Sequence, residues 1–261
     1  MQKRQVEFKI ITQKIFILLP CLFFIQLSQL FGKDYNAIST SRPGIGNPTS
    51  AVPAGLYQFE IGTILTDTST LSAPMLLRMG FFKKTELQVG YVSKSVTLGV
   101  LYGGIHIISG LENSIMLTTS LPIPTNGISY EENNDSLIEF SAYLPISYSF
   151  QNGFSVSGQI AETFYNNAEI NPIISYSLAI GSSIDEKTSW FFEADPSEIL
   201  NLKDDKNNPF SVKYGLTFLS DKNNVQFDLS IGLTFKKKSS MWQTLVEENY
   251  VEGGVSFRLP R

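Results

Sequence analysis

The segment 225–235 alternates strictly between apolar and polar residues. Its odd-numbered positions are Val, Phe, Leu, Ile, Leu and Phe, whereas its even-numbered positions are Gln, Asp, Ser, Gly and Thr. A helix does not separate residues with a period of two, but a β-strand does when its two faces meet an apolar and a polar environment. Weaker forms of this alternation recur along the chain, and no segment of comparable quality has the period of a helix. The sequence therefore predicts an all-β fold.

The alternating segments predict about twelve strands of about ten residues each, the length that a tilted strand needs to cross a membrane. Pro145 lies within one of them and cannot donate a backbone hydrogen bond, so we expect a bulge or a strand boundary there. The predicted strands cover residues 55–64, 73–82, 86–91, 96–107, 113–122, 137–149, 154–164, 173–182, 188–195, 210–218, 225–235 and 251–258.

Connection lengths distinguish a membrane barrel from a soluble β-sandwich, since both folds alternate with a period of two. The predicted connections are short at one rim and longer at the other, except for 93–95, and this asymmetry is typical of outer-membrane barrels. Aromatic residues gather near both rims, as in a membrane barrel, although strands are rich in aromatic residues generally. We predict an antiparallel transmembrane β-barrel with short periplasmic turns and longer extracellular loops. The short turns are 82–85, 109–112, 151–153, 185–187 and 220–224, and the longer loops are 66–71, 124–136, 165–171, 196–209 and 236–249.

The N-terminus has the pattern of a secretory signal peptide, which we assign to residues 1–32. A basic segment precedes an apolar run over 15–25 that is shorter than a membrane span. An uncleaved anchor helix and a lipoprotein signal at Cys21 are the alternatives. The basic residues are Lys3, Arg4, Lys9 and Lys14.

Residues 33–54 form a region of their own, which we call the arm. Its three prolines exclude a long helix or a central strand. The arm is a linker, a periplasmic extension or a segment folded into a lumen. Residues 55–261 are then the barrel domain.

Composition argues against several functions. The formal net charge of −4 does not favour nucleic acid as a partner. One cysteine, Cys21, and one histidine, His106, provide neither a disulfide framework nor the ligands of a zinc site. By its alternation with Val100 and Tyr102, His106 is expected to face lipid near the short-turn rim, and no nucleophile motif accompanies it. We predict no enzyme, no cofactor and no metal site.

Three charged clusters fall in or near the predicted long loops. The acidic clusters 131–135 and 204–205 lack the spacing of a calcium loop, so we interpret them as solvated loop charge. The basic cluster 236–238 either meets lipopolysaccharide phosphates or is a solvated strand end.

Charged and amide side chains occupy the polar face of the predicted strands. Burying this many charges in a packed core is costly, so we expect them in a wet lumen. There they either form salt bridges across the interior or line a solute path. The predicted lumen-lining residues are Glu60, Arg78, Glu86, Gln88, Glu139, Glu193, Lys213, Asp228, Glu252 and Arg258.

Glu60 and Arg78 lie about equally far from the centre of the predicted loop 66–71. In an antiparallel hairpin we therefore expect them nearly opposite each other, with Glu86 and Gln88 on the other side of Arg78. We predict that this cluster fixes the interior and holds part of the arm in the lumen as a plug, whereas an arm hanging in the periplasm is the alternative. The predicted plug residues are Arg42, Pro43 and Gly44.

Three groups of residues carry a resemblance to a known family. They are Arg42-Pro43-Gly44 with 52–62, Leu77-Arg78-Met79-Gly80 with 85–90, and 225–233 with 253–257. In these segments the chain resembles the outer-membrane transporter family named after the MetA pathway of phenol degradation. The resemblance implies a bacterial outer-membrane barrel with a transport role.

The last strand also resembles the C-terminal signal that the barrel-assembly machinery reads. The residues that fit its spacing are Glu252, Gly254, Phe257 and Leu259, and the departure is that Pro260 and Arg261 follow in place of a terminal aromatic residue. The resemblance implies the barrel-assembly machinery as a partner during insertion.

Two classes of function follow for a barrel of the bacterial outer membrane. One is a narrow or plugged channel or transporter for small solutes, with hydrophobic or aromatic solutes as one option. The other is a non-conducting barrel that acts structurally or through its extracellular loops. In either class the expected partners are outer-membrane lipid and lipopolysaccharide.

Overall fold

The computed structural model describes residues 38, 40, 46–67, 71–92, 95–123, 137–167, 171–195, 210–237 and 244–260. The predicted signal peptide, the plug residues 42–44 and the loop clusters 131–135 and 204–205 lie outside these ranges. In the described part of the chain, no helix is long and apolar enough to cross a membrane.

The described residues form thirteen β-strands. The strands are β1 (Leu56–Thr66), β2 (Leu71–Ser72), β3 (Met75–Phe82), β4 (Thr85–Val92), β5 (Ser95–Ile108), β6 (Leu111–Pro122), β7 (Glu139–Ser149), β8 (Phe154–Tyr165), β9 (Ile173–Ser183), β10 (Thr188–Asp195), β11 (Phe210–Leu219), β12 (Val225–Lys237) and β13 (Thr244–Pro260).

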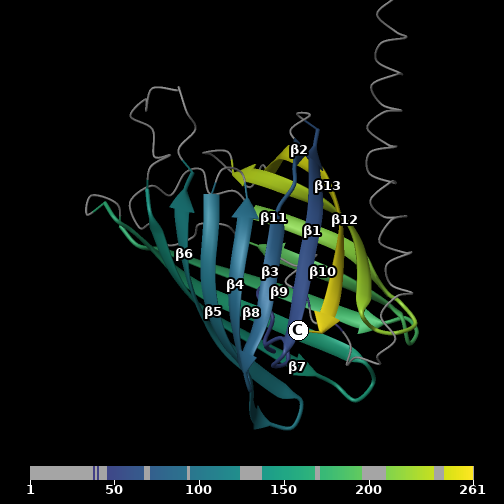
Figure 1. Cartoon of the computed structure of the whole chain (residues 1–261). Helices are drawn as coiled ribbons and strands as arrows, with labels where there is room; N and C mark the ends of the chain where they lie inside the picture. Colours follow the sequence, from purple (N-terminus) through teal and green to yellow (C-terminus); the bar gives the residue numbers. More distant parts are fainter. Residues whose placement is uncertain are drawn as a thin grey trace, which may run out of the picture.

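Twelve of these strands close into an antiparallel barrel (Figure 1). Each long strand pairs with its neighbours in sequence, and β1 pairs with β13 along its whole length, from Leu56↔Pro260 to Thr66↔Tyr250. The two-residue strand β2 pairs with β1 only, beside β3. Closure leaves no free edge among the long strands, as a barrel in lipid requires. The predicted fold class is confirmed.

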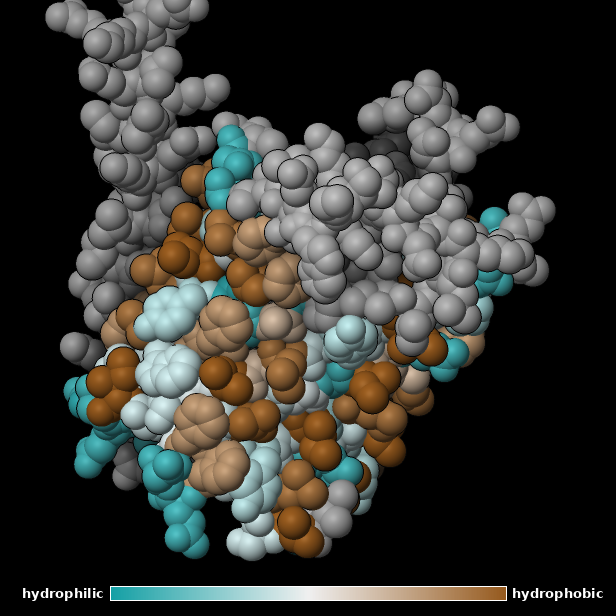
Figure 2. Space-filling view, turned by 180° about the vertical axis from the view of Figure 1, so that it is seen from behind, coloured by the Kyte–Doolittle hydropathy of each residue, from teal (hydrophilic) through white to brown (hydrophobic). Residues whose placement is uncertain are grey.

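The alternation of the sequence maps onto the two faces of the wall. On β12, Leu229 and Ile231 are 53% and 60% exposed, whereas Ser230 between them is 2% exposed. Because the same alternation runs around the barrel, apolar side chains gather on its outer surface (Figure 2). A largely apolar outer face on a closed barrel is the arrangement that lipid stabilises.

The two rims differ in the length of their connections. At one rim the strands are joined by two to five residues, for example Lys83 and Lys84 between β3 and β4. At the other rim, the segments 123–138 and 196–209 are much longer, and 93–94 is the expected exception. The predicted long loop 236–249 is wrong, since β12 and β13 continue to pair beyond a bulge at Thr234 and leave only 238–243 between them.

Pro145 does not interrupt β7. It pairs with Gln159 on β8, and the β6–β7 register is the same on both sides of it, at Asn113↔Ile146 and Met116↔Tyr143. Only the two pairs between these positions are missing. The predicted bulge or strand boundary is therefore wrong, because the wall tolerates a gap of two pairs on the side that lacks the proline N–H.

Candidate functional site: the barrel interior

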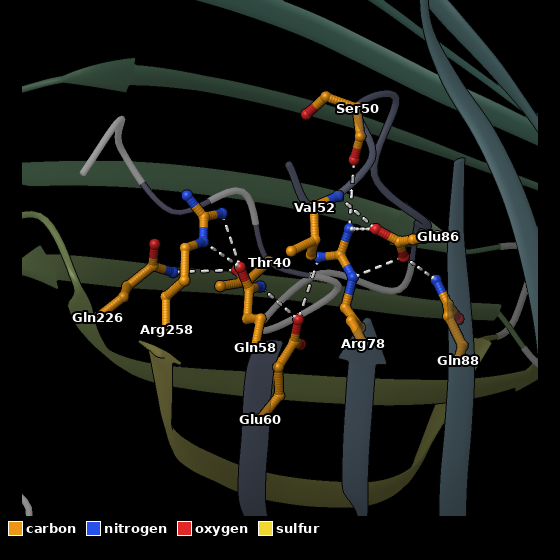
Figure 3. Close-up of polar contacts among 10 residues, drawn as sticks. All are labelled: Thr40, Ser50, Val52, Gln58, Glu60, Arg78, Glu86, Gln88, Gln226 and Arg258. Carbon is orange, nitrogen blue, oxygen red and sulfur yellow. Dashed lines mark hydrogen bonds and ion pairs between the residues drawn. The ribbon is translucent and has the colours of Figure 1, made fainter. Parts of the chain in front are cut away.

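A row of polar side chains crosses the inner face of β4, β3, β1 and β13 (Figure 3). Gln88 Nε2 donates to Glu86 Oε1 at 2.5 Å, and Gln58 Nε2 donates to Glu60 Oε1 at 2.8 Å. Arg258 on β13 donates to Gln58 Oε1 through Nη2 at 2.7 Å. This row joins the first and last strands of the barrel, so it crosses the position where the barrel closes.

Arg78 stands at the centre of the row and is fully buried. Its Nε and Nη2 lie 2.8 and 2.9 Å from the two carboxylate oxygens of Glu86, and its Nη1 lies 3.2 Å from Glu60 Oε1. The predicted arrangement, with acceptors on both sides of Arg78, is confirmed. A buried guanidinium with two carboxylate partners satisfies most of its donors, and its planar fork matches the geometry of Glu86.

Glu60 lies on the predicted face, but the prediction that it is nearly opposite Arg78 is wrong by two residues along β1. Gln58 is the residue opposite Arg78, and Glu60 is opposite Leu76. The hairpin turns about residue 68, since Ile64 pairs with Ser72 in the same register. Arg78 reaches Glu60 along the diagonal, a distance that a long side chain can cover.

A second group of charges lies on β10, β11 and β13. Lys213 Nζ lies 2.6 Å from Glu252 Oε2, and Lys213 is directly opposite Glu193 in the pairing of β10 and β11. Gly232 stands between Lys213 and Tyr250 in the sheet, and a Cβ at Gly232 would lie 2.1 Å from Cζ of the Tyr250 ring. A side chain at position 232 would therefore displace the tyrosine ring that covers the inner wall.

The structure brings the predicted lumen-lining residues together on one face. Nine of the ten are buried, and Glu139, at the first position of β7, is half-buried. The buried nine are Glu60, Arg78, Glu86, Gln88, Glu193, Lys213, Asp228, Glu252 and Arg258.

Part of the arm lies against this inner face. Val52 N donates to Glu86 Oε2 at 2.6 Å, and Arg78 Nη2 donates to the Ser50 carbonyl at 3.2 Å (Figure 3). Gly80 lies beneath the arm, since a Cβ there would be 2.0 Å from the Pro53 carbonyl oxygen. Arg78 and Glu86, which form an ion pair with each other, therefore also bind the arm backbone.

The contacts of the arm continue across the interior to more distant strands. On β6, Ser114 Oγ donates to the Pro48 carbonyl at 3.0 Å, and Glu112 Oε2 accepts a hydrogen bond from Thr49 Oγ1 at 3.0 Å. The backbone of the arm also bends toward β8 and β10. The contacts there are Asn47 N to Gln159 Oε1 at 2.8 Å and Gly46 N to Glu193 Oε1 at 2.9 Å.

Thr40 lies still farther around the barrel, where its Oγ1 accepts a hydrogen bond from Gln226 Nε2 on β12 at 3.0 Å. Sequence reasoning missed Glu112, Gln159 and Gln226 as arm contacts. The only feature of the sequence that could have indicated them is that each is a polar residue at an inward position of its strand.

A bulge reverses the orientation expected for His106. After Tyr102 the β5–β6 register shifts by one residue, at Gly104, which has a φ of +68°. His106 is therefore opposite Glu112, with Nε2 3.8 Å from Glu112 Oε1. Because Glu112 also contacts the arm, His106 belongs to the inner face near the short-turn rim. The prediction that it faces lipid is wrong, since an inserted residue inverts the alternation.

A cavity of about 250 Å³ opens near the short-turn rim between β8 and β11. Hydroxyl groups line much of it, and Phe191 provides an aromatic ring. Gln159 and Glu193, which hold the arm, come two residues after the lining residues Ser157 and Phe191 on the same strands. Within the described ranges, no group of three or more His, Cys, Asp or Glu residues is placed to hold a metal ion.

Comparison with known proteins identifies the fold. No protein-family model and no curated protein matches the chain. A KdgM porin in complex with disordered oligogalacturonate is 11% identical, with a TM-score of 0.55 over 77% of this chain and 98% of that one. The NanC porin is 10% identical, with a TM-score of 0.56 over 77% of this chain and 100% of that one.

The COG4313 outer membrane channel from Pseudomonas putida F1 is 9% identical, with a TM-score of 0.57 over 85% of this chain and 100% of that one. The chain thus has the twelve-stranded barrel fold of outer-membrane porins. The predicted location in the bacterial outer membrane agrees with this fold. Membership of the phenol-pathway family is not confirmed.

Proposed function

We propose that this protein is a narrow outer-membrane channel for small solutes, and that its arm, residues 33–54, lies in the lumen as a plug. The observation that carries the proposal is the path of the arm between Gly46 and Val52. Over these residues it hydrogen-bonds to inward-facing side chains on β3, β4, β6, β8 and β10. A segment held at so many points around the wall occupies cross-section that a solute would otherwise use.

The size of the barrel supports a narrow path. Barrels of about eight strands are filled by their own side chains, whereas those of 16–18 strands leave an open aqueous channel, and twelve strands fall between these limits. The polar inner wall supports passage of small polar solutes. Phe191 and Tyr250, whose rings cover Gly215 and Gly232 on the inner face, together with the family resemblance, support aromatic solutes as a second group.

Single-channel conductance in planar bilayers tests the proposal. Residues 33–261, called the mature chain, and a variant of it that lacks residues 38–50 are reconstituted separately. A mobility shift between heated and unheated protein on a gel shows that each barrel is folded. We expect a small conductance for the mature chain and a larger one for the deletion variant, which retains the Val52–Glu86 contact. Equal conductance would remove the plug from the proposal. Flat traces from both folded proteins would contradict the channel and favour a non-conducting barrel.

A further inference from the structure

We infer that the lumen selects small cations over anions, an inference that rests on the proposed channel function. The described side chains on the inner face of the barrel include nine carboxylates and three permanent cations. The carboxylates are Glu60, Glu86, Glu112, Glu139, Glu193, Asp195, Asp228, Glu248 and Glu252, and the cations are Arg78, Lys213 and Arg258.

The ion pairs of the inner face do not balance this excess. Arg78 is shared between Glu60 and Glu86, and Lys213 pairs with Glu252 while Glu193 lies opposite it. Each of these two cations therefore meets two carboxylates. The interior remains acidic after its ion pairs are formed.

The arm leaves the sign of this charge unchanged. Residues 46–54 carry no ionisable side chain, and they contact Glu86 and Glu193 through backbone N–H groups. Over the whole arm the charged residues are Lys33, Asp34 and Arg42, so its formal charge is +1 against an excess of six carboxylates on the wall. The combined interior is net negative.

A lumen whose wall carries an excess of one sign of charge concentrates counter-ions and disfavours ions of its own sign. Such fields are focused in narrow clefts with low-dielectric walls, and rings of Asp and Glu give cation selectivity in channels. The screening length of about 8 Å at physiological ionic strength means that the wall charges act over a narrow lumen rather than only at contact. Anionic solutes are correspondingly disfavoured.

Glu139 and Asp195 are the best positions at which to test this inference. Glu139 is the first residue of β7 and Asp195 the last residue of β10, so both stand at the long-loop end of the wall, and both are only half-buried. Their substitution leaves the Arg78 and Lys213 ion pairs in place. Glu162 provides the matched control, since it lies on the neighbouring strand β8 but shares the outward, exposed alternation of Ile160 and Phe164.

The experiment measures the reversal potential of single channels in a KCl gradient. It uses two backgrounds, the mature chain and the variant lacking residues 38–50. Each background is measured unchanged, with the double substitution Glu139→Gln/Asp195→Asn, and with the control substitution Glu162→Gln. We expect K⁺ to permeate about tenfold better than Cl⁻, the lower end of the enrichment that a focused field gives, and the preference to weaken as the salt concentration rises. The double substitution should reduce the K⁺/Cl⁻ ratio by about twofold or more, because it removes two of the nine carboxylates that produce the field, and Glu162→Gln should leave it unchanged.

The outcomes separate the two proposals. A conducting channel with equal or greater permeability to Cl⁻ would overturn the cation preference and leave the channel function standing. A cation preference that the inward and outward substitutions change equally would show that the inner wall is not its source. Absence of conductance in every folded variant would overturn the channel function and the selectivity with it.

Discussion

Arg78 and Glu86 form a two-pronged ion pair inside the barrel, with Nε to Oε1 at 2.8 Å and Nη2 to Oε2 at 2.9 Å, and neither side chain is exposed to solvent. The same Glu86 carboxylate accepts a hydrogen bond from Val52 N of the arm. One contact therefore stabilises the wall and positions the arm. Removing either partner is expected to affect both.

Arg78→Ala should lower stability by about 3–5 kcal/mol, because it leaves buried carboxylates without their cation. It should also increase conductance, since the arm loses the donor to the Ser50 carbonyl. Denaturant unfolding in detergent and single-channel recording measure the two effects. Lys187→Ala, which removes an exposed pair with Asp221 in the short turns, is the control and should change neither. A barrel as stable as the parent after Arg78→Ala would contradict the assigned role.

Charged substitutions on the outer face of β12 should destabilise the barrel. Leu229→Arg places a guanidinium on the lipid side of the wall, where it costs roughly 2–4 kcal/mol near the middle of the membrane. Ser155→Arg is the control, since Ser155 lines the cavity near the short-turn rim and offers room for the side chain. Unfolding in lipid vesicles measures both. Equal destabilisation by the two substitutions would show that the faces are assigned incorrectly.

Gly80→Ala should displace the arm. The added Cβ would lie 2.0 Å from the Pro53 carbonyl oxygen, so the arm backbone must move, at a cost of about 1–3 kcal/mol. We expect a higher conductance, as for the deletion of residues 38–50. Gly90→Ala is the matched control on the adjacent strand, because its nearest neighbour would be 3.6 Å away. Identical conductance in the two variants would count against an arm seated on Gly80.

The turn between β9 and β10 should have a pH-dependent stability. Asp185 accepts hydrogen bonds from the backbone N–H groups of Lys187 and Thr188, at 2.8 and 2.7 Å, and these bonds lower the pKa of its carboxyl group. A lowered pKa in the folded state means that this stabilisation is present above the unfolded pKa and is lost as the pH falls through the folded one.

Asp185→Ala should therefore be less stable than the parent at neutral pH, and the difference should vanish in acid. Thermal unfolding over a pH series measures it. Glu186→Ala in the same turn serves as the control. A stability difference that does not depend on pH would show that the charge of Asp185 is not involved.

The strands were predictable because a wall between lipid and a polar interior imposes its period on every residue, as at Leu229 and Ser230. The register was less predictable, since a hairpin that turns one residue earlier moves Gln58, in place of Glu60, opposite Arg78. The face of His106 does not follow from the alternation of β5, because the bulge at Gly104 adds one residue and inverts the alternation after it.

The path of the arm was the least predictable part of the site. It is held largely through its backbone, at Gly46, Asn47 and Val52, and backbone N–H groups have no sequence pattern. In the barrel sequence, the arm is reflected in Gly80 and Gly103, where an added Cβ would meet the arm backbone. Their meaning is clear only once the arm is in place.

Cross-linking between the arm and the wall tests the central claim most directly. In a Cys21→Ser background, Asn47→Cys is combined with Gln159→Cys, its hydrogen-bond partner on the inner face of β8, or with Ile160→Cys, which is exposed on the outer face. A short bifunctional thiol reagent should cross-link the folded Asn47→Cys/Gln159→Cys protein, seen as a changed mobility on a denaturing gel, and should not cross-link the protein with Ile160→Cys, because the reagent covers the reach of the replaced glutamine side chain. Failure of the inward pair to cross-link in folded protein, or equal cross-linking by both pairs, would contradict an arm seated inside the barrel.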